Sequence, residues 1–132
     1  MKYLVDTHIL LWSFFEPRRL PENIRDILTD TSNEIYFSPV SLWEISIKYA
    51  LKKLFLNGLT PEDFYKELHG SFYKCKEFNG LNAVTNYKLP ILHKDPFDRF
   101  LIWEAIQSGF ILLSADGDVM KYRSEGLQVI SG

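Results

Sequence analysis

Residues 2–12 read KYLVDTHILLW, and this stretch begins a pattern of short strands and helices. The apolar run of residues 3–5 predicts a buried strand, and residues 9–15 predict a helix that Pro17 ends. Asp6 lies between the two. A carboxylate at that position has two interpretations: it caps the helix that follows, or it belongs to a functional site at the carboxyl end of the strand.

Similar short apolar runs alternate with helical patterns along the rest of the chain. Further strands are predicted at residues 34–37, 76–78, 110–113 and 127–130, and further helices at 21–29, 38–54, 60–69, 81–87 and 95–108. In the helix that begins at Ser38, the residues Trp43, Ile47, Ala50 or Leu51, and Leu54 form one apolar stripe. The Trp43 part of this stripe belongs either to the core or to an interface with a partner protein. Strands separated by helices favour a parallel sheet covered on both faces. The sequence therefore predicts a three-layer α/β/α fold with a mainly parallel central sheet, forming a single domain over residues 1–132.

Composition narrows the class of protein. The chain has 132 residues, of which 46% are hydrophobic, so one domain with a substantial core is expected. The lone Cys75 allows no internal disulfide, and the apolar patch before Asp6 is too short for a signal peptide or a membrane span. We therefore expect a cytoplasmic protein. A net charge of −2 argues against a generally basic nucleic-acid binder, but it does not exclude a nuclease with acidic metal ligands.

Several acidic residues follow predicted strands or begin predicted helices, and each has an explanation that involves no function. Asp116 stands in an Asp-Gly turn, and Asp95 before Pro96 is a typical N-cap. Glu44 has capping-box spacing from Ser41 and could pair with Lys48. Taken one at a time, these acids therefore leave structural and functional interpretations open.

The acids are more informative as a set, because the predicted topology brings Asp6, Glu44, Asp98 and Asp116 to one edge of the sheet. Carboxylates without His or Cys suit Mg²⁺ or Mn²⁺, which activate water and neutralise charge on a phosphate. Carboxylates held together also repel one another, so their pKa values are expected to be raised when no cation is bound.

Four segments together resemble a known family. They are VDTHILLW at 5–12, SPVSLWEISIK at 38–48, HKDPFDRFLIWEA at 93–105 and LLSADGDV at 112–119. In this order they look like the PIN-domain ribonucleases of VapC type, the toxins of type II toxin–antitoxin systems. The resemblance runs from Lys2 to about Tyr122.

The resemblance implies that Asp6, Glu44, Asp98 and Asp116 are the catalytic, metal-binding acids, with Asp118 as a rival for the fourth position. It implies a Mg²⁺-dependent endoribonuclease, with Mn²⁺ as a substitute cation, that hydrolyses RNA phosphodiester bonds. The implied partners are an RNA substrate, a cognate antitoxin protein and a second copy of the chain, with no membrane. The alternative is a PIN-like module that binds RNA or protein without cleavage.

Other polar residues near these motifs have structural interpretations. The hydroxyls of Thr7 and Ser114 have two interpretations: a local backbone hydrogen bond, which is favoured, or a hydrogen bond that holds a carboxylate or a metal-bound water. His8 and His93 are expected to be structural or partner-facing, because an acidic metal site needs no imidazole base. Candidate RNA-gripping residues, all close to the acidic motifs, are Lys48, Lys52, Lys53, Lys94 and Arg99.

Overall fold

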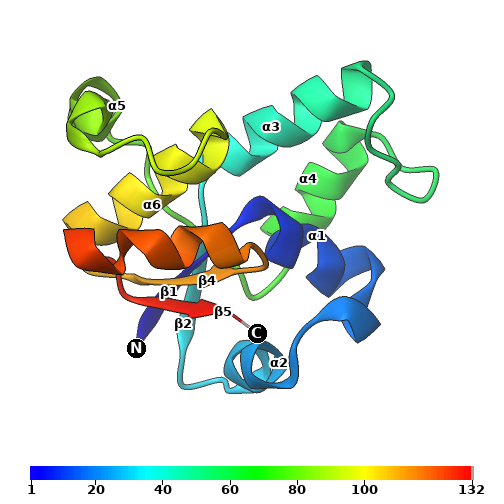
Figure 1. Ribbon diagram of the computed structural model, residues 1–132. Helices are drawn as coiled ribbons and strands as arrows, with labels where there is room; N and C mark the ends of the chain where they lie inside the picture. Colours follow the sequence, from blue (N-terminus) through cyan, green and yellow to red (C-terminus); the bar gives the residue numbers. More distant parts are fainter. Residues whose placement is uncertain (132) are drawn as a thin grey trace.

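The computed structural model describes residues 1–131, and Gly132, the last residue of the predicted domain, lies outside them. Helices cover both faces of a central sheet (Figure 1). The strands are β1 Lys2–Val5, β2 Glu34–Phe37, β3 Lys74–Cys75, β4 Ile111–Ser114 and β5 Val129–Ser131. The α-helices are α1 Thr7–Phe15, α2 Glu22–Thr29, α3 Pro39–Ala50, α4 Pro61–His69, α5 Gly80–Thr85 and α6 Pro96–Ser108, and the 3₁₀ helices are η1 Pro17–Arg19, η2 Asn86–Lys88 and η3 Gly117–Glu125.

The sheet has five strands in the order β3-β2-β1-β4-β5, and every pairing is parallel. The central strand β1 pairs with β2 through Tyr3 opposite Ile35, and with β4 through Leu4 opposite Leu112. After β1, the chain adds β2 and then β3 on one side of it, and later adds β4 and then β5 on the other side. The order therefore reverses between β1 and β4, the type of position where open parallel sheets bind ligands.

Successive side chains of β1 point to opposite faces and feed two hydrophobic cores. Tyr3 and Val5 pack with residues of α1, α2 and α4, whereas Leu4 packs with residues of α6 and η3. Burial on both faces explains why residues 3–5 of β1 are all apolar rather than alternating. The predicted three-layer α/β/α class and parallel sheet are confirmed.

Helix α3 buries a face that includes little of its apolar stripe. Trp43 and Leu51 are 63% and 58% exposed, so of the two alternatives for Trp43 the structure favours a surface position over the core. The buried residues of α3 are Val40, Ser41, Glu44 and Ile45. Two of them are polar, because this side of the helix faces the carboxyl edge of the sheet, and a polar inner face cannot be recognised from apolar periodicity.

Several boundaries also differ from the predicted ones. α3 ends at Ala50 rather than 54, because Lys52 adopts a left-handed conformation (φ 58°) and the Lys53 N–H bonds to the Lys48 carbonyl. β4 begins one residue late, because the Phe110 N–H bonds to the Ala105 carbonyl.

The remaining differences concern short elements. β3 occupies residues 74–75 instead of 76–78, because its partner β2 ends at Phe37. β5 covers 129–131 instead of 127–130, α5 covers 80–85 instead of 81–87, and the 3₁₀ helices at 17–19 and 117–125 were not predicted. Strands of two or three residues and the single 3₁₀ turn at 17–19 have too few residues to show a periodicity.

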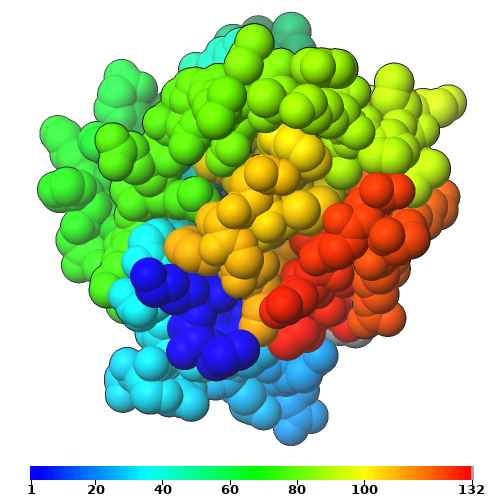
Figure 2. Space-filling model, turned by 90° about the vertical axis from the view of Figure 1, so that its left-hand side faces the viewer, coloured from blue at the N-terminus to red at the C-terminus, as the bar shows by residue number. Residues whose placement is uncertain are grey.

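Figure 2 shows the side of the molecule on which the N-terminal residues lie. The N-terminal residues, in blue, lie beside the end of α6, in gold, and close to the red C-terminal segment. Lys2 places its ammonium 5.7 Å from the centre of the Phe110 ring. No helix within residues 1–131 has both the length and the apolar character that a membrane span requires.

Glu104, on the inner side of α6, is a fully buried carboxylate. Within residues 1–131, neither of its oxygens receives a hydrogen bond of normal geometry. Burial raises its pKa, although the nearby Ser38 hydroxyl and Lys76 ammonium oppose this in part. The folded protein therefore holds a proton on Glu104 more tightly than the unfolded chain does.

We predict that Glu104→Gln stabilises the protein at pH 8 but not at pH 4. The pKa of this carboxyl is raised from 4.5 on folding, so its contribution to stability is intact below that pH and is lost as the pH rises toward the folded value. Raising a pKa by one on folding costs about 1.4 kcal/mol of stability at high pH. Chemical denaturation at both pH values measures the effect, with the exposed Glu67→Gln as control. An equal change at both pH values would contradict the assignment.

Candidate metal centre

Asp6 follows the last residue of β1 and lies where the strand order reverses. It is 2% exposed, and its carboxylate accepts three hydrogen bonds. Oδ1 accepts from the Ile9 N–H at 2.8 Å, so Asp6 caps α1. Oδ2 accepts from the Ser114 hydroxyl at 2.8 Å and the Ala115 N–H at 2.9 Å. The two interpretations of Asp6 are therefore compatible: it caps a helix and also joins the carboxyl ends of β1 and β4.

Glu44 reaches the same edge of the sheet from α3 and is 1% exposed. The Thr7 hydroxyl donates to its Oε1 at 2.6 Å, and Lys48 pairs with its Oε2 as expected from the sequence. The predicted capping box with Ser41 is wrong, because Ser38 is the N-cap of α3. Glu44 is thus held by a hydroxyl and an ammonium in a fixed orientation.

Asp98 lies in the first turn of α6 and is 9% exposed. Asp95 caps this helix by accepting from the Phe97 N–H at 2.9 Å, as predicted. Within residues 1–131, no hydrogen bond reaches the Asp98 carboxylate, and its one close polar contact is the Nε2 of His93, 3.3 Å from Oδ2. Burial raises the pKa of Asp98 to about 7, and the negative charges of Asp95 and Asp6 add to this effect.

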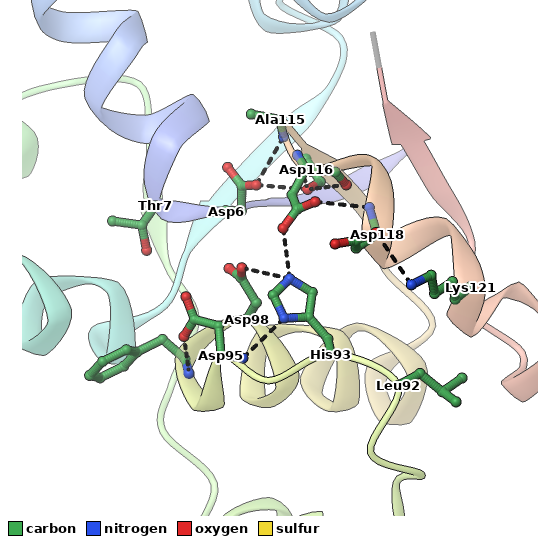
Figure 3. A network of polar contacts seen from close by, with 12 residues as sticks. Asp6, Thr7, Leu92, His93, Asp95, Asp98, Ala115, Asp116, Asp118 and Lys121 are labelled. Carbon is green, nitrogen blue, oxygen red and sulfur yellow. Dashed lines mark hydrogen bonds and ion pairs between the residues drawn. The ribbon is translucent and has the colours of Figure 1, made fainter.

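Asp116 comes from the turn after β4, and its carboxylate faces Asp98 (Figure 3). Its Oδ1 accepts from the Asp118 N–H at 2.8 Å, and its Oδ2 lies 2.6 Å from His93 Nε2. Burial raises the pKa of Asp116, but these two hydrogen bonds outweigh burial and lower it overall. The predicted rise of the pKa is therefore found for Asp6 and Asp98 and is wrong for Asp116.

The rival acid Asp118 does not face the other carboxylates. Its side chain is exposed and lies 3.4 Å from the ammonium of Lys121. Figure 3 shows it on the far side of Asp116, directed away from His93. The geometry therefore favours Asp116 over Asp118 as the fourth acid.

His93 lies between Asp98 and Asp116, a position that the sequence interpretation missed. One ligand atom each from His93, Asp98 and Asp116 can be chosen so that all three lie within 4.8 Å of one another. The His93 backbone is fixed by a hydrogen bond from its N–H to the Tyr122 hydroxyl at 3.0 Å. A signal was present in the sequence, because His93 stands two residues before the N-cap Asp95 and so close to the start of α6.

The hydroxyls near the site follow the second of their two interpretations. Thr7 donates to Glu44, and Ser114 donates to Asp6, so both hold carboxylates. Among residues 1–131, Arg99 pairs with no carboxylate, and its guanidinium donates to the Leu89 carbonyl at 3.0 Å. That contact holds the Arg99 side chain against the loop before α6.

The side chains present fit a hard divalent cation. Asp98 and Asp116 offer carboxylate oxygens at the switch point, with Asp6 and Glu44 close enough to Asp98 that their charges raise its pKa. The Lys48 ammonium is already paired with Glu44, which leaves Asp98 without a full counter-charge among the described residues. A cation beside Asp98 would offset the cost of burying its charge.

Comparison with known proteins places this chain in a family. The family model described as PIN domain matches residues 3–124. This span covers most of the chain, so the chain belongs to the PIN-domain family. No curated protein matches the chain significantly.

Solved structures with the same fold include proteins described as VapBC and FitAcB. VapBC2 from Rickettsia felis, bound to a DNA fragment from its promoter, is 16% identical with a TM-score of 0.69, and the match covers 100% of this chain and 99% of that one. DNA-bound VapBC from Salmonella typhimurium is 18% identical with a TM-score of 0.67, covering 99% and 98%. FitAcB from Neisseria gonorrhoeae is 18% identical with a TM-score of 0.63, covering 97% and 96%. At these identities the likeness demonstrates the shared fold.

We predict that the side-chain carboxyl of Asp98 titrates near pH 7 in protein freed of divalent cations by a chelator. The cause is burial together with the charges of neighbouring acids. Carbon NMR of the Asp carboxyls measures the titration, and the resonance is assigned by its loss in Asp98→Asn. If every Asp carboxyl titrated below pH 5, this electrostatic description of the site would be wrong.

Proposed function

We propose that this protein is a metal-dependent endoribonuclease of VapC type that hydrolyses RNA phosphodiester bonds. The observation that carries the proposal is the convergence of Asp6, Glu44, Asp98 and Asp116 at the switch point of a PIN fold. Four acids from four separate elements have no common structural reason to meet there. Membership of the PIN family and the toxin–antitoxin complexes with the same fold support this class of activity.

Asp98 and Asp116 are the residues we expect to hold Mg²⁺, or Mn²⁺ in its place, because their carboxylates face each other. Asp6 and Glu44 complete the acidic set, with their orientations fixed by Ser114 and Thr7. When bound, such a cation lowers the pKa of coordinated water and neutralises charge on the scissile phosphate. The protein holds these carboxylates in place before a cation binds, because each is fixed by a hydrogen bond or by its position at the start of a helix. Binding a cation therefore requires little further ordering of these side chains.

A cation and an aromatic ring lie directly beside the acids and suit an RNA strand. Trp12, Arg19 and Asp116 help to line a shallow hollow of about 340 Å³. The Arg19 guanidinium stacks 4.3 Å from the centre of the Trp12 ring. Single-stranded RNA is commonly bound by arginine on phosphate and by aromatic rings under bases. Lys52, Lys53 and Lys94 are exposed and remain candidates for further phosphate contacts.

We predict that Asp6→Asn, Asp98→Asn and Asp116→Asn each lower Mg²⁺- or Mn²⁺-dependent RNA cleavage by at least about 100-fold, because each removes an acidic ligand or its support. Asp118→Asn is the matched control, since Asp118 is exposed and paired with Lys121, and it should cleave like wild type. The readout is the cleavage rate on structured and single-stranded RNA, with circular dichroism to check folding.

Two results would count against this function. Wild type that cleaves no RNA with either cation would favour the alternative, a PIN-like module that binds RNA or protein without cleavage. Asp98→Asn and Asp116→Asn variants that cleave as fast as wild type would separate the activity from the acidic set.

The proposed biological role is that of a cytoplasmic toxin with an antitoxin partner, acting as a homodimer. Trp43 of α3 is an exposed apolar residue, and so are Leu51 and Phe55 just beyond the helix. We expect a partner protein to bury this apolar surface. Sedimentation at micromolar concentration tests the dimer, and we expect about twice the mass of one chain. A single monomeric species would contradict the dimer while leaving the nuclease proposal standing.

A further inference from the structure

His93 is the one imidazole among the described residues that contacts the acidic set, and both of its ring nitrogens are engaged. Nε2 lies 2.6 Å from Asp116 Oδ2 and 3.3 Å from Asp98 Oδ2. On the other side of the ring, Nδ1 accepts a hydrogen bond from the Asp95 backbone N–H at 3.0 Å. Figure 3 shows the ring spanning the space between the start of α6 and the loop after β4.

The contact at Nδ1 determines where the proton of the ring lies. A backbone N–H can only donate, so Nδ1 must present its lone pair to Asp95 and cannot carry a proton. The proton of the neutral ring is therefore on Nε2, which donates to Asp116. An Nε2 that carries a proton has no lone pair for a metal ion.

The surroundings keep the ring in this orientation. The N–H groups of Leu92 and His93 both donate to the Tyr122 hydroxyl, which in turn donates to the Pro90 carbonyl at 2.8 Å. Tyr122 is fully buried in the core beneath α6. Moving the proton to Nδ1 to free Nε2 for a metal would set that proton against the Asp95 N–H, which would lose its acceptor.

We infer that His93 is a positioning residue that holds the Asp116 carboxylate for the divalent cation through its Nε2–H, and is not itself a metal ligand. This inference rests on the proposed function, because it assumes that these acids bind a cation. The Nε2–H engages Asp116 Oδ2, and the Asp118 N–H engages Oδ1, each leaving a second lone pair on its oxygen. Hydrogen bonds of this kind orient metal-binding carboxylates and commonly affect metal affinity about 10- to 100-fold.

The first experiment uses pulsed electron paramagnetic resonance on wild-type protein loaded with Mn²⁺. We expect no coupling from a nitrogen nucleus bonded directly to the ion. A directly bound nitrogen signal that disappears in His93→Gln would overturn the inference while leaving the proposed metal-dependent function intact. Failure of wild type to bind Mn²⁺ at all would overturn both.

The second experiment compares two substitutions by calorimetric titration with Mn²⁺. His93→Leu removes the donor and should weaken binding roughly 10- to 100-fold, whereas His93→Gln keeps an N–H donor toward Asp116 and should stay within about threefold of wild type. His69→Leu, at an exposed position on α4, is the matched control and should bind like wild type. Equal weakening by Leu and Gln, or no weakening by Leu, would overturn the inference. The resonance experiment on wild type decides the question even if a variant fails to fold.

Discussion

The buried carboxylate of Asp6 is the constraint on which the rest of this structure depends. A charge at 2% exposure is costly unless it is hydrogen-bonded, and Asp6 meets that cost with donors from α1 and from the end of β4. These bonds fix the two strands on either side of the switch point relative to each other. The position of Asp116 follows, because the loop that carries it begins at the Ser114 and Ala115 groups that Asp6 holds.

The four acids of this edge are accommodated in different ways, and the differences suggest their roles. Asp6 is held by neutral donors, Glu44 by Thr7 and Lys48, and Asp116 by His93 and the Asp118 N–H. Asp98 alone has no hydrogen bond among residues 1–131, and its pKa is raised to about 7. A bound cation would therefore offset the largest unfavourable charge if it lay beside Asp98. Asp116 lies next to this position, because both acids are close to His93 Nε2.

Much of this architecture could be predicted from the sequence, because strands and helices with strong patterns dominate it. The bounds of β1, α2 and β2 match the predicted ones to within a residue or so, and Asp95 caps α6 as expected. Prediction failed where side chains serve the site instead of the core. α3 buries Glu44 and leaves Trp43 exposed, and its apolar stripe alone did not decide which face is buried. The place of His93 depends on Tyr122, 29 residues away, and no local pattern reports such a contact.

The central claim is that the carboxylates at the switch point bind a divalent cation, and anomalous X-ray scattering from crystals soaked in Mn²⁺ tests it most directly. We expect an anomalous peak within bonding distance of oxygens of both Asp98 and Asp116, and none at exposed acids such as Glu62. If the density for Asp98 and Asp116 were ordered but showed no anomalous peak between them at saturating Mn²⁺, the claim would be contradicted.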